Sequence, residues 1–276
     1  MSPRALAASG GAVLLALALT GCSPLQDALA RLSHSAVTGT PIDAYDLDRD
    51  APFAGSPAED YGEGFETPEA EPVGDFSREQ VEEAYARTRE LLEAVYLNQD
   101  AVFREDNGEF ASLLSGRPLD WYMDNLGNTD PELDTRGLTF NLTNGTAEPV
   151  GDVVKVDGAM RAEAARDEQG WDYLAVRTEY TIVHPVARPG DAVSVRLVTT
   201  HHGEVAFHDI GLDELEAWPL WWRFVGPAHC LDEHTFTPAY PDEFSEGEKP
   251  GGLPQDAYDR EAVAEDPDGC QPIKDT

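Results

Sequence analysis

The stretch that decides the fold of this 276-residue chain is Trp171–Val186, which reads WDYLAVRTEYTIVHPV. Apolar side chains recur there at every second position, which is the period of a half-buried β-strand. The residues expected on its buried face are Leu174, Val176, Tyr180 and Ile182. Arg177 and Glu179 fall on the opposite face, so the stretch predicts a strand with one side in a core and the other in water.

Three neighbouring segments have the same period and predict strands over Val153–Arg166, Ala192–His202 and Trp218–Val225. Short turns at Asp167–Gly170 and Ala187–Asp191 separate the first three of the four strands. Because such short connections join antiparallel neighbours, we expect an antiparallel sheet.

The segment before the predicted sheet has apolar residues at helical spacing. Ser77 and Gln80 make a capping box, so a helix should begin there. Apolar residues then recur every three or four positions over residues 81–103, which predicts one long amphipathic helix. Phe110–Ser115 and Leu119–Leu126 predict two short helices before the sheet begins.

Helices followed by a curved antiparallel sheet define an α+β domain. This order of elements resembles the NTF2-like or SnoaL-like superfamily, in which a long N-terminal helix packs across a strongly bent sheet to form a cone. The resemblance covers roughly residues 76–225 and rests on element order, not on motif residues. It implies a cone whose mouth holds a small apolar ligand near Tyr85 and Trp121. Cystatin-like folds share the helix-over-sheet plan and are the alternative.

The N-terminus reads as a leader peptide. Arg4 precedes an apolar run, Ala5–Leu19, that is shorter than the roughly 20 residues needed to span a bilayer. The run closes on Leu19-Thr20-Gly21-Cys22, which resembles the lipobox of bacterial lipoprotein precursors. This resemblance implies cleavage before Cys22 and fatty acylation of that residue, with palmitate as a typical chain. An ordinary secretory peptide is the alternative.

Four regions are expected along the chain. They are a signal peptide over 1–21, a lipidated cysteine with an acidic disordered tether over 22–75, an α+β domain over 76–240 and an acidic irregular tail over 241–276. Lipidation of Cys22 leaves Cys230 and Cys270, which export places in an oxidising compartment. We therefore predict a disulfide between them that links the tail covalently to the domain. A metal-binding or catalytic thiol is the competing interpretation.

The charge of the chain limits its partners. Its formal net charge is −34, from 53 acidic and 19 basic residues. Nucleic-acid binders need a basic stripe that releases phosphate counterions, so DNA and RNA are excluded as partners. Basic proteins and divalent cations stay open, although solubility alone also explains an acidic surface.

The most aromatic segment surrounds Trp221. Strand alternation predicts that Leu220, Trp222 and Phe224 point inward and that Trp221 points outward beside Arg223. An exposed indole stacks readily on a sugar or a peptide, so Trp221 is a candidate binding residue. Packing within the fold is the alternative.

Two histidines are candidate metal ligands. His202 and His208 would share one face of a strand if no turn intervened. Gly203 is expected to bend or bulge that strand, and no carboxylate stands at a recognised ligand spacing. Structural or solvated imidazoles are the alternative.

No catalytic residues are assigned, because no nucleophile, base or phosphate loop occurs at a diagnostic spacing. The expected function is a non-catalytic cell-envelope lipoprotein on the extracytoplasmic face of the membrane, without a cofactor, which binds an envelope protein or a small molecule. The alternatives are a SnoaL-like small-ligand enzyme and a metal- or glycan-binding sensor. The lipid anchor supplies the contact with the membrane.

Overall fold

A computed structural model describes residues 47–211, 214–230, 234–244, 256–260 and 271–272. The chain divides into two compact units, Met1–Gly39 and Thr40–Thr276, and all described residues belong to the second. The predicted leader, the lipobox with Cys22 and the first part of the tether lie outside the described residues.

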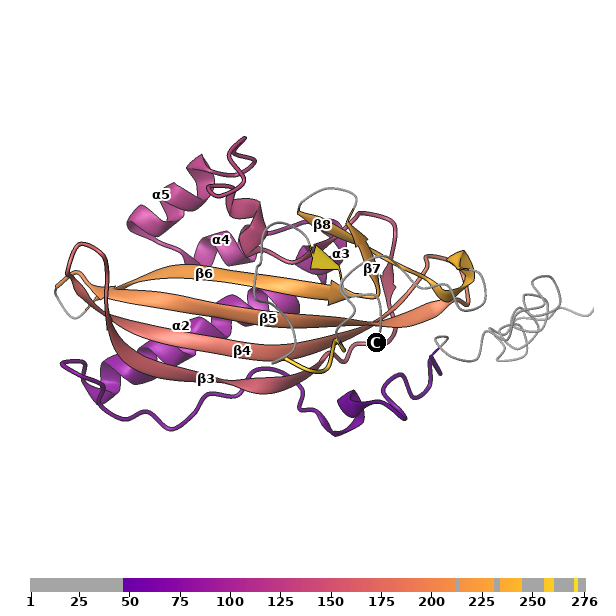
Figure 1. Ribbon diagram of the computed structural model, residues 1–276, viewed down its shortest axis with the longest axis horizontal. Coiled ribbons are helices and arrows are strands. Elements are labelled where there is room, and N and C mark those ends of the chain that lie inside the picture. Colours follow the sequence, from indigo (N-terminus) through magenta and orange to yellow (C-terminus); the bar gives the residue numbers. More distant parts are fainter. Residues whose placement is uncertain (1–46, 212–213, 231–233, 245–255, 261–270, 273–276) are drawn as a thin grey trace, which may run out of the picture. The chain divides into compact units, whose positions relative to one another are not determined.

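The centre of the fold is an antiparallel sheet in the order β3-β4-β5-β6 (Figure 1). Its long strands are β3 (Lys155–Arg166), β4 (Asp172–Ala187), β5 (Ser194–Asp209) and β6 (Leu215–Gly226). Two short strands extend the sheet, β2 (Glu148–Pro149) beside β4 and β9 (Gln271–Pro272) parallel to β6. The predicted α+β class with an antiparallel sheet is therefore confirmed, and the sheet does not close into a barrel.

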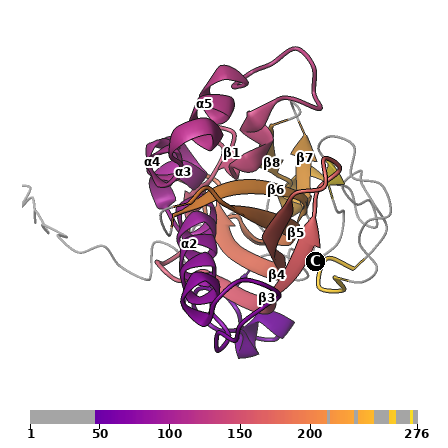
Figure 2. The same cartoon turned by 90° about the vertical axis from the view of Figure 1, so that its left-hand side faces the viewer.

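Helix α2 (Arg78–Tyr96) covers one face of this sheet, called here the inner face (Figure 2). Its predicted capping box is present: the Gln80 backbone N–H donates to Ser77 Oγ at 3.3 Å, and the Ser77 N–H donates to Gln80 Oε1 at 2.9 Å. The buried side of α2 consists of Val81, Ala84, Tyr85, Thr88, Leu91, Leu92, Ala94, Val95 and Tyr96. The capping box thus predicted the start of the helix, and the amphipathic spacing predicted the side that it buries.

The helix ends earlier than its apolar spacing predicted. Asn98 begins a separate helix, α3 (Gln99–Arg104), and its side chain accepts hydrogen bonds from the backbone N–H groups of Asp100 and Ala101 at 2.9 and 3.3 Å. Asparagine caps helices well, and this cap opposes continuation of the preceding turn. The remaining helices are η1 (Pro57–Asp60), α4 (Gly108–Leu113), α5 (Gly116–Asp124), η2 (Thr135–Leu138) and η3 (Pro241–Glu243).

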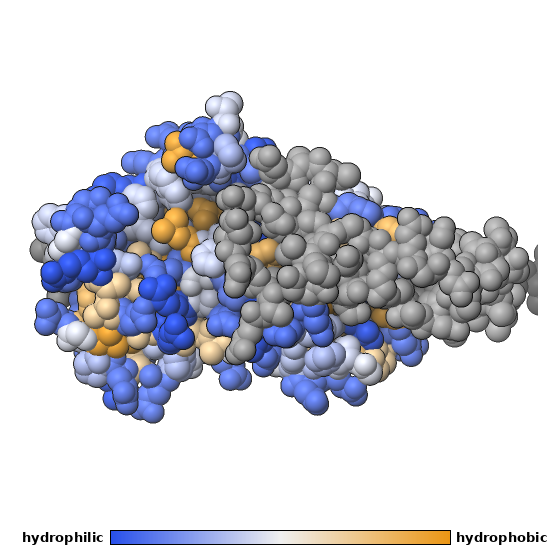
Figure 3. Space-filling view, in the orientation of Figure 1, coloured by the Kyte–Doolittle hydropathy of each residue, from blue (hydrophilic) through white to orange (hydrophobic). Residues whose placement is uncertain are grey.

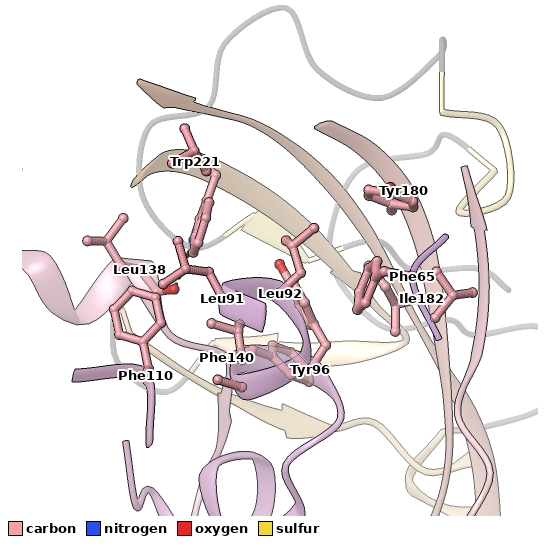
Figure 4. Close-up of a cluster of buried hydrophobic side chains, with 14 of the residues drawn as sticks. Phe65, Leu91, Leu92, Tyr96, Phe110, Leu138, Phe140, Tyr180, Ile182 and Trp221 are labelled. Atoms are coloured by element: carbon pink, nitrogen blue, oxygen red, sulfur yellow. Dashed lines mark hydrogen bonds between the residues drawn. The ribbon is translucent and has the colours of Figure 1, made fainter. Parts of the chain in front are cut away.

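A second, small sheet in the order β1-β8-β7 completes the described fold. Its strands are β1 (Asn141–Leu142), β7 (Ala228–Cys230) and β8 (Thr235–Pro238). The main core lies between α2, these elements and the inner face, and its largest members include Leu91, Tyr96, Phe140 and Ile182 (Figure 4). Each such side chain contributes about 1.5–3 kcal/mol when it leaves water.

The predicted disordered tether is wrong for residues 47–75. Ala58 and Phe65 are buried, and the Val156 N–H donates to the Gly62 carbonyl at 2.9 Å. Phe65 enters the main core against Tyr180, with ring centroids 4.9 Å apart. The apolar residues of this segment show no period, but Leu47, Ala58 and Phe65 each join a buried cluster with residues of the sheet, so composition alone could not reveal the packing.

Part of the predicted irregular tail also packs on the sheet. Ala257 joins Ala58 in a small cluster on the outer face, where Val183, Val198 and Phe224 are its other buried members. Elsewhere hydrophilic residues dominate the surface in the view of Figure 3, and apolar residues form small separate groups. Two segments, one before the predicted domain in the sequence and one after it, therefore cover part of the outer face.

Candidate ligand-binding cleft

Strand β6 presents Trp221 and Arg223 to the interior, the reverse of the prediction. The exposed fraction is 8% for Trp221, against 55% for Leu220 and 43% for Trp222. Figure 4 shows Trp221 among the buried side chains. The prediction of an exposed Trp221 is therefore wrong: strand alternation separated the two faces of β6 correctly, but the inner face was assigned to Leu220, Trp222 and Phe224.

The residue opposite Trp221 explains this orientation. Gly203 of β5 pairs with Trp221 in the sheet, and β5 continues through it without the predicted bulge. A Cβ added at Gly203 would lie 2.5 Å from the Trp221 Cβ. The missing side chain leaves the space that the indole needs.

Two backbone carbonyls then fix the inward side chains of β6. Trp221 Nε1 donates to the Leu138 carbonyl at 2.8 Å, and Arg223 Nη1 donates to the Thr139 carbonyl. Both carbonyls belong to the segment that contains η2 and its C-terminal cap. The segment 131–139 is thereby held beside the strand.

A cleft of about 270 Å³ lies between this segment and β6. Its apolar walls include Trp121, Leu133, Leu138, Trp221 and Phe236, and its polar groups include Asp134, Thr139, Arg223 and His234. Small-molecule sites have this character, a mostly apolar concavity with a few fixed polar groups. The cleft therefore has the build of a site for a small ligand.

Asp134 stiffens one wall of the cleft. Its side chain is only 1% exposed; it accepts hydrogen bonds from the Gly127 N–H at 3.0 Å and from Arg136, and it pairs with His234 at 3.0 Å. Burial opposes ionisation, but the hydrogen bonds from Arg136 and Gly127 outweigh it and hold the pKa of Asp134 below its ordinary value. This carboxylate is thus ionised and its charge is already balanced.

Arg223 is the opposite case, a buried cation that the described residues do not balance. Arg223 is 8% exposed, its Nε and Nη2 atoms are shut off from solvent, and its side chain interacts with the neutral Tyr96 hydroxyl. Its guanidinium lies over the rings of Tyr96 and Phe140, at 5.4 and 5.9 Å from their centroids. Such cation–π contacts contribute about 2 kcal/mol, less than the several kcal/mol lost on burying a charge.

The polar groups behind Arg223 are neutral. The Tyr96 hydroxyl lies 2.8 Å from His201 Nδ1, and His201 Nε2 lies 2.9 Å from Thr178 Oγ1. Burial, followed by the Arg223 charge, lowers the pKa of His201 well below its ordinary value. Burial raises the pKa of the Tyr96 hydroxyl, although Arg223 opposes that shift. Neither group supplies an anion at neutral pH.

The other predicted binding residues divide between the cleft and the core. Trp121 lines the cleft and packs on Trp218, with ring centroids 5.8 Å apart. Tyr85 is buried between α2 and β3, where its hydroxyl accepts a hydrogen bond from the Ala162 N–H at 2.9 Å. Sequence reasoning missed Asp134 and His234, since only the folded chain brings η2 and β8 together at this cleft.

The two candidate metal ligands do not meet. His202 and His208 share the outer face of β5, but six residues of strand separate them by roughly 20 Å. His202 stacks on Trp222 and His208 on Tyr173, with ring centroids 6.0 and 5.2 Å apart. Within the ranges that the structure describes, no group of three or more His, Cys, Asp or Glu residues is placed to hold a metal ion.

The predicted disulfide lies partly outside the described residues, because Cys270 is not among them. Strand β7 ends at Cys230, and β9, which begins one residue after Cys270, contacts β7. The pairing therefore stays a prediction that the neighbouring strands favour.

Comparison with protein families, curated proteins and solved structures finds no match for this chain. Among the described helices, none has the length and apolar character that a membrane crossing requires.

Proposed function

We propose that this protein is a non-catalytic cell-envelope lipoprotein that binds a small molecule in the cleft beside β6. The observation that carries the proposal is the cleft itself, about 270 Å³, whose two walls are joined by hydrogen bonds from Trp221 and Arg223 to backbone carbonyls. A cavity that is already formed binds without a large cost in ordering.

Binding is favoured over catalysis by the state of the cleft's ionisable groups. Asp134 is held ionised by Arg136 and Gly127, so it is a poor proton donor near neutral pH. Burial lowers the pKa of Arg223, but the guanidinium stays protonated at physiological pH. These groups suit recognition of a ligand and not general acid–base chemistry.

The proposed fold is the NTF2-like cone, with the cystatin-like plan as its alternative. Support comes from α2, which crosses the inner face of an antiparallel sheet, and from short helices gathered at the β6 edge (Figure 1).

The proposed location is the extracytoplasmic face of the cell membrane, with a lipid on Cys22 as the anchor. Support comes from the apolar run that ends at Leu19-Thr20-Gly21-Cys22. The ligand is then a molecule met outside the cytoplasm, and nucleic acid is not among the partners because of the charge of −34.

Native mass spectrometry of the full lipoprotein, purified from membranes in mild detergent, tests the cleft. We expect a bound small molecule that is lost in Trp121→Ala, which removes a wall of the cleft, and that is recovered chemically unchanged. Trp171→Ala is the matched control, because Trp171 is 71% exposed at the β3–β4 turn and does not line the cleft. A cleft that stays empty, in purified protein and against a ligand-detected NMR screen, would reject the proposal, as would turnover of the bound molecule.

A further inference from the structure

Strand β6 leaves most of one edge of the main sheet unpaired within the described residues. β5 pairs with β6 along its whole length on one side, whereas β9 pairs only with Phe224 and Val225 on the other. We propose that the cleft beside β6 binds a short, extended peptide with basic side chains, which pairs with this edge as an added strand. The inference rests on the proposed function, because the peptide is the small molecule that occupies the same cleft.

The register of the sheet shows which backbone groups of β6 face this edge. Successive residues of a strand direct their N–H and C=O groups alternately to the two sides. The Pro185 carbonyl of β4 points away from β5, since it accepts a hydrogen bond from the Val150 N–H at 2.9 Å. Unbroken pairing through β5 carries this alternation to β6, where the odd-numbered residues face away from β5. Pro219, which has no N–H to donate, stands at one of these positions, as expected for a proline in a strand.

Trp221 and Arg223 are the odd-numbered residues of β6 that line the cleft. The N–H and C=O groups of Trp221 and the N–H of Arg223 therefore face it, and none of the three has a hydrogen-bond partner among the residues that the structure describes. An unpaired strand edge is a template for an extended chain, which binds through main-chain hydrogen bonds. β9 pairs with the next two residues of the same edge, so this edge already accepts one added strand.

A strand added here would place its side chains in two environments. Alternate side chains would point inward, to the apolar walls formed by Trp121, Leu133 and Phe236. The others would lie on the outer face beside Leu220 and Trp222, which are 55% and 43% exposed. The edge along the cleft, residues 220–223, is about 13 Å long, so the peptide pairs over roughly four residues.

The charges of the cleft favour a basic peptide. Glu132 lines the cleft, is exposed, and makes no ion pair within the described ranges. Asp134, the other carboxylate of the lining, is already engaged by Arg136 and His234. The formal net charge of −34 also attracts a cationic ligand. Basic side chains on the outer, solvent-facing side of the added strand fit these charges.

Isothermal titration calorimetry on the full lipoprotein in neutral detergent at pH 7.5 tests the assignment with a capped peptide, Lys-Val-Lys-Val-Lys. Its isomer Lys-Lys-Lys-Val-Val has the same charge and composition without the alternation. We expect the alternating peptide to bind at least about tenfold more tightly, because the isomer as a strand cannot turn both valines into the cleft.

Two N-methylated forms of the alternating peptide test the backbone pairing. One is methylated on the two valine nitrogens and the other on the nitrogens of the last two lysines, so each loses two donors. Because only alternate N–H groups of a strand face its neighbour, one form should lose at least about tenfold in affinity. The other should bind like the unmethylated peptide.

A pair of variants tests whether the peptide lies in this cleft. Glu132→Gln should weaken binding of the alternating peptide about two- to fivefold, the effect of one exposed ion pair. Glu168→Gln is the matched control, because Glu168 is exposed at the β3–β4 turn and does not line the cleft, yet its loss changes the net charge equally. Thermal unfolding confirms that both variants fold.

Equal affinities for the two isomers, or equal effects of the two methylation patterns, would overturn the assignment of an added strand and leave the binding cleft standing. Failure of the peptides to bind, or an equal loss in Glu132→Gln and Glu168→Gln, would also overturn it. The proposed function falls only if the wild-type cleft is empty in the native mass spectra and the NMR screen as well, so the two failures are distinguishable.

Discussion

His184 links the stability of the core to pH. It is fully buried, its Nε2–H donates to the Tyr96 carbonyl at 2.8 Å, and its Nδ1 has no partner among the described residues. Burial lowers the pKa of His184 from 6.5 to about 4, and the hydrogen bond to Tyr96 only partly offsets the shift. Because the unfolded chain binds this proton more readily, the contribution of His184 to stability is complete above pH 6.5 and is lost as the pH falls towards 4.

We predict that His184→Gln reduces this sensitivity to acid. Glutamine keeps a donor for the Tyr96 carbonyl but does not titrate. Between pH 7.5 and pH 5, the free energy of unfolding of the wild type should fall by about 2 kcal/mol relative to the variant. Urea denaturation at both pH values measures the difference, in which the titration of the carboxylates and of His201 cancels. Identical pH profiles would contradict the prediction.

Gly203 is the residue on which the inward position of Trp221 depends. We predict that Gly203→Ala destabilises the fold by about 1–3 kcal/mol, because the added Cβ would lie 2.5 Å from the Trp221 Cβ and 3.0 Å from Thr178 Oγ1. Gly137→Ala is the control, since nothing lies within 4 Å of a Cβ added there. Thermal unfolding and the emission of Trp221 report the two effects, and equal melting temperatures for both variants would disprove the role of Gly203.

At the scale of elements, the capping box of α2 should contribute measurably. Ser77→Ala removes the side-chain acceptor for the Gln80 N–H and should lower the free energy of unfolding by about 1 kcal/mol. Ser115→Ala is a matched control, because Ser115 is the N-cap of α5 but makes no side-chain capping hydrogen bond. Chemical denaturation distinguishes the two, and an equal loss in both variants would show that the capping bond contributes nothing.

We predict a disulfide between Cys230 and Cys270, near the place where β7 and β9 make contact. Its loop of about 40 residues should stabilise the fold by roughly 4 kcal/mol in the chain-entropy model. Intact-mass measurement with and without reductant detects it, and Cys270→Ser should lower the melting temperature as reduction does. Two free thiols in protein from an oxidising compartment would refute it.

The elements differ in how far sequence could predict them. The period of two in β4 and the cap at Ser77 are local patterns, so strand, helix and buried side were all predictable. The orientation of Trp221 was not, because it depends on Gly203, a neighbour in space and not in sequence. The packing of residues 47–75 and the pairing of β9 depend likewise on a surface that exists only after the sheet has formed.

The candidate site was predictable only in part for the same reason. Trp121 and Trp221 were both named as binding residues, but the fold brings them together from helix and strand and leaves Tyr85 elsewhere. The charge of Arg223 is visible in the sequence, whereas its burial follows from the correct face of β6. Sequence patterns supplied the candidates, and the assembled sheet decides which of them share a cleft.

For the whole molecule, the charge and the proposed anchor act in opposite directions at the membrane. Loss of Arg4 with the leader changes the net charge from −34 to −35, and such a protein is repelled by anionic lipid within about 8 Å at physiological salt. Two or three acyl chains outweigh that repulsion, since each buried methylene contributes about 0.8 kcal/mol.

We predict that Cys22→Ser moves the protein from the detergent phase to the aqueous phase in a Triton X-114 partition of producing bacteria. Cys270→Ser, which leaves the lipobox intact, should stay in the detergent phase, and mass spectrometry of the wild type should find an acylated N-terminal cysteine. If Cys22→Ser stays in the detergent phase, or if the wild type is unacylated, the proposed lipid anchor is wrong. The proposed binding cleft does not depend on this result, because native mass spectrometry tests it separately.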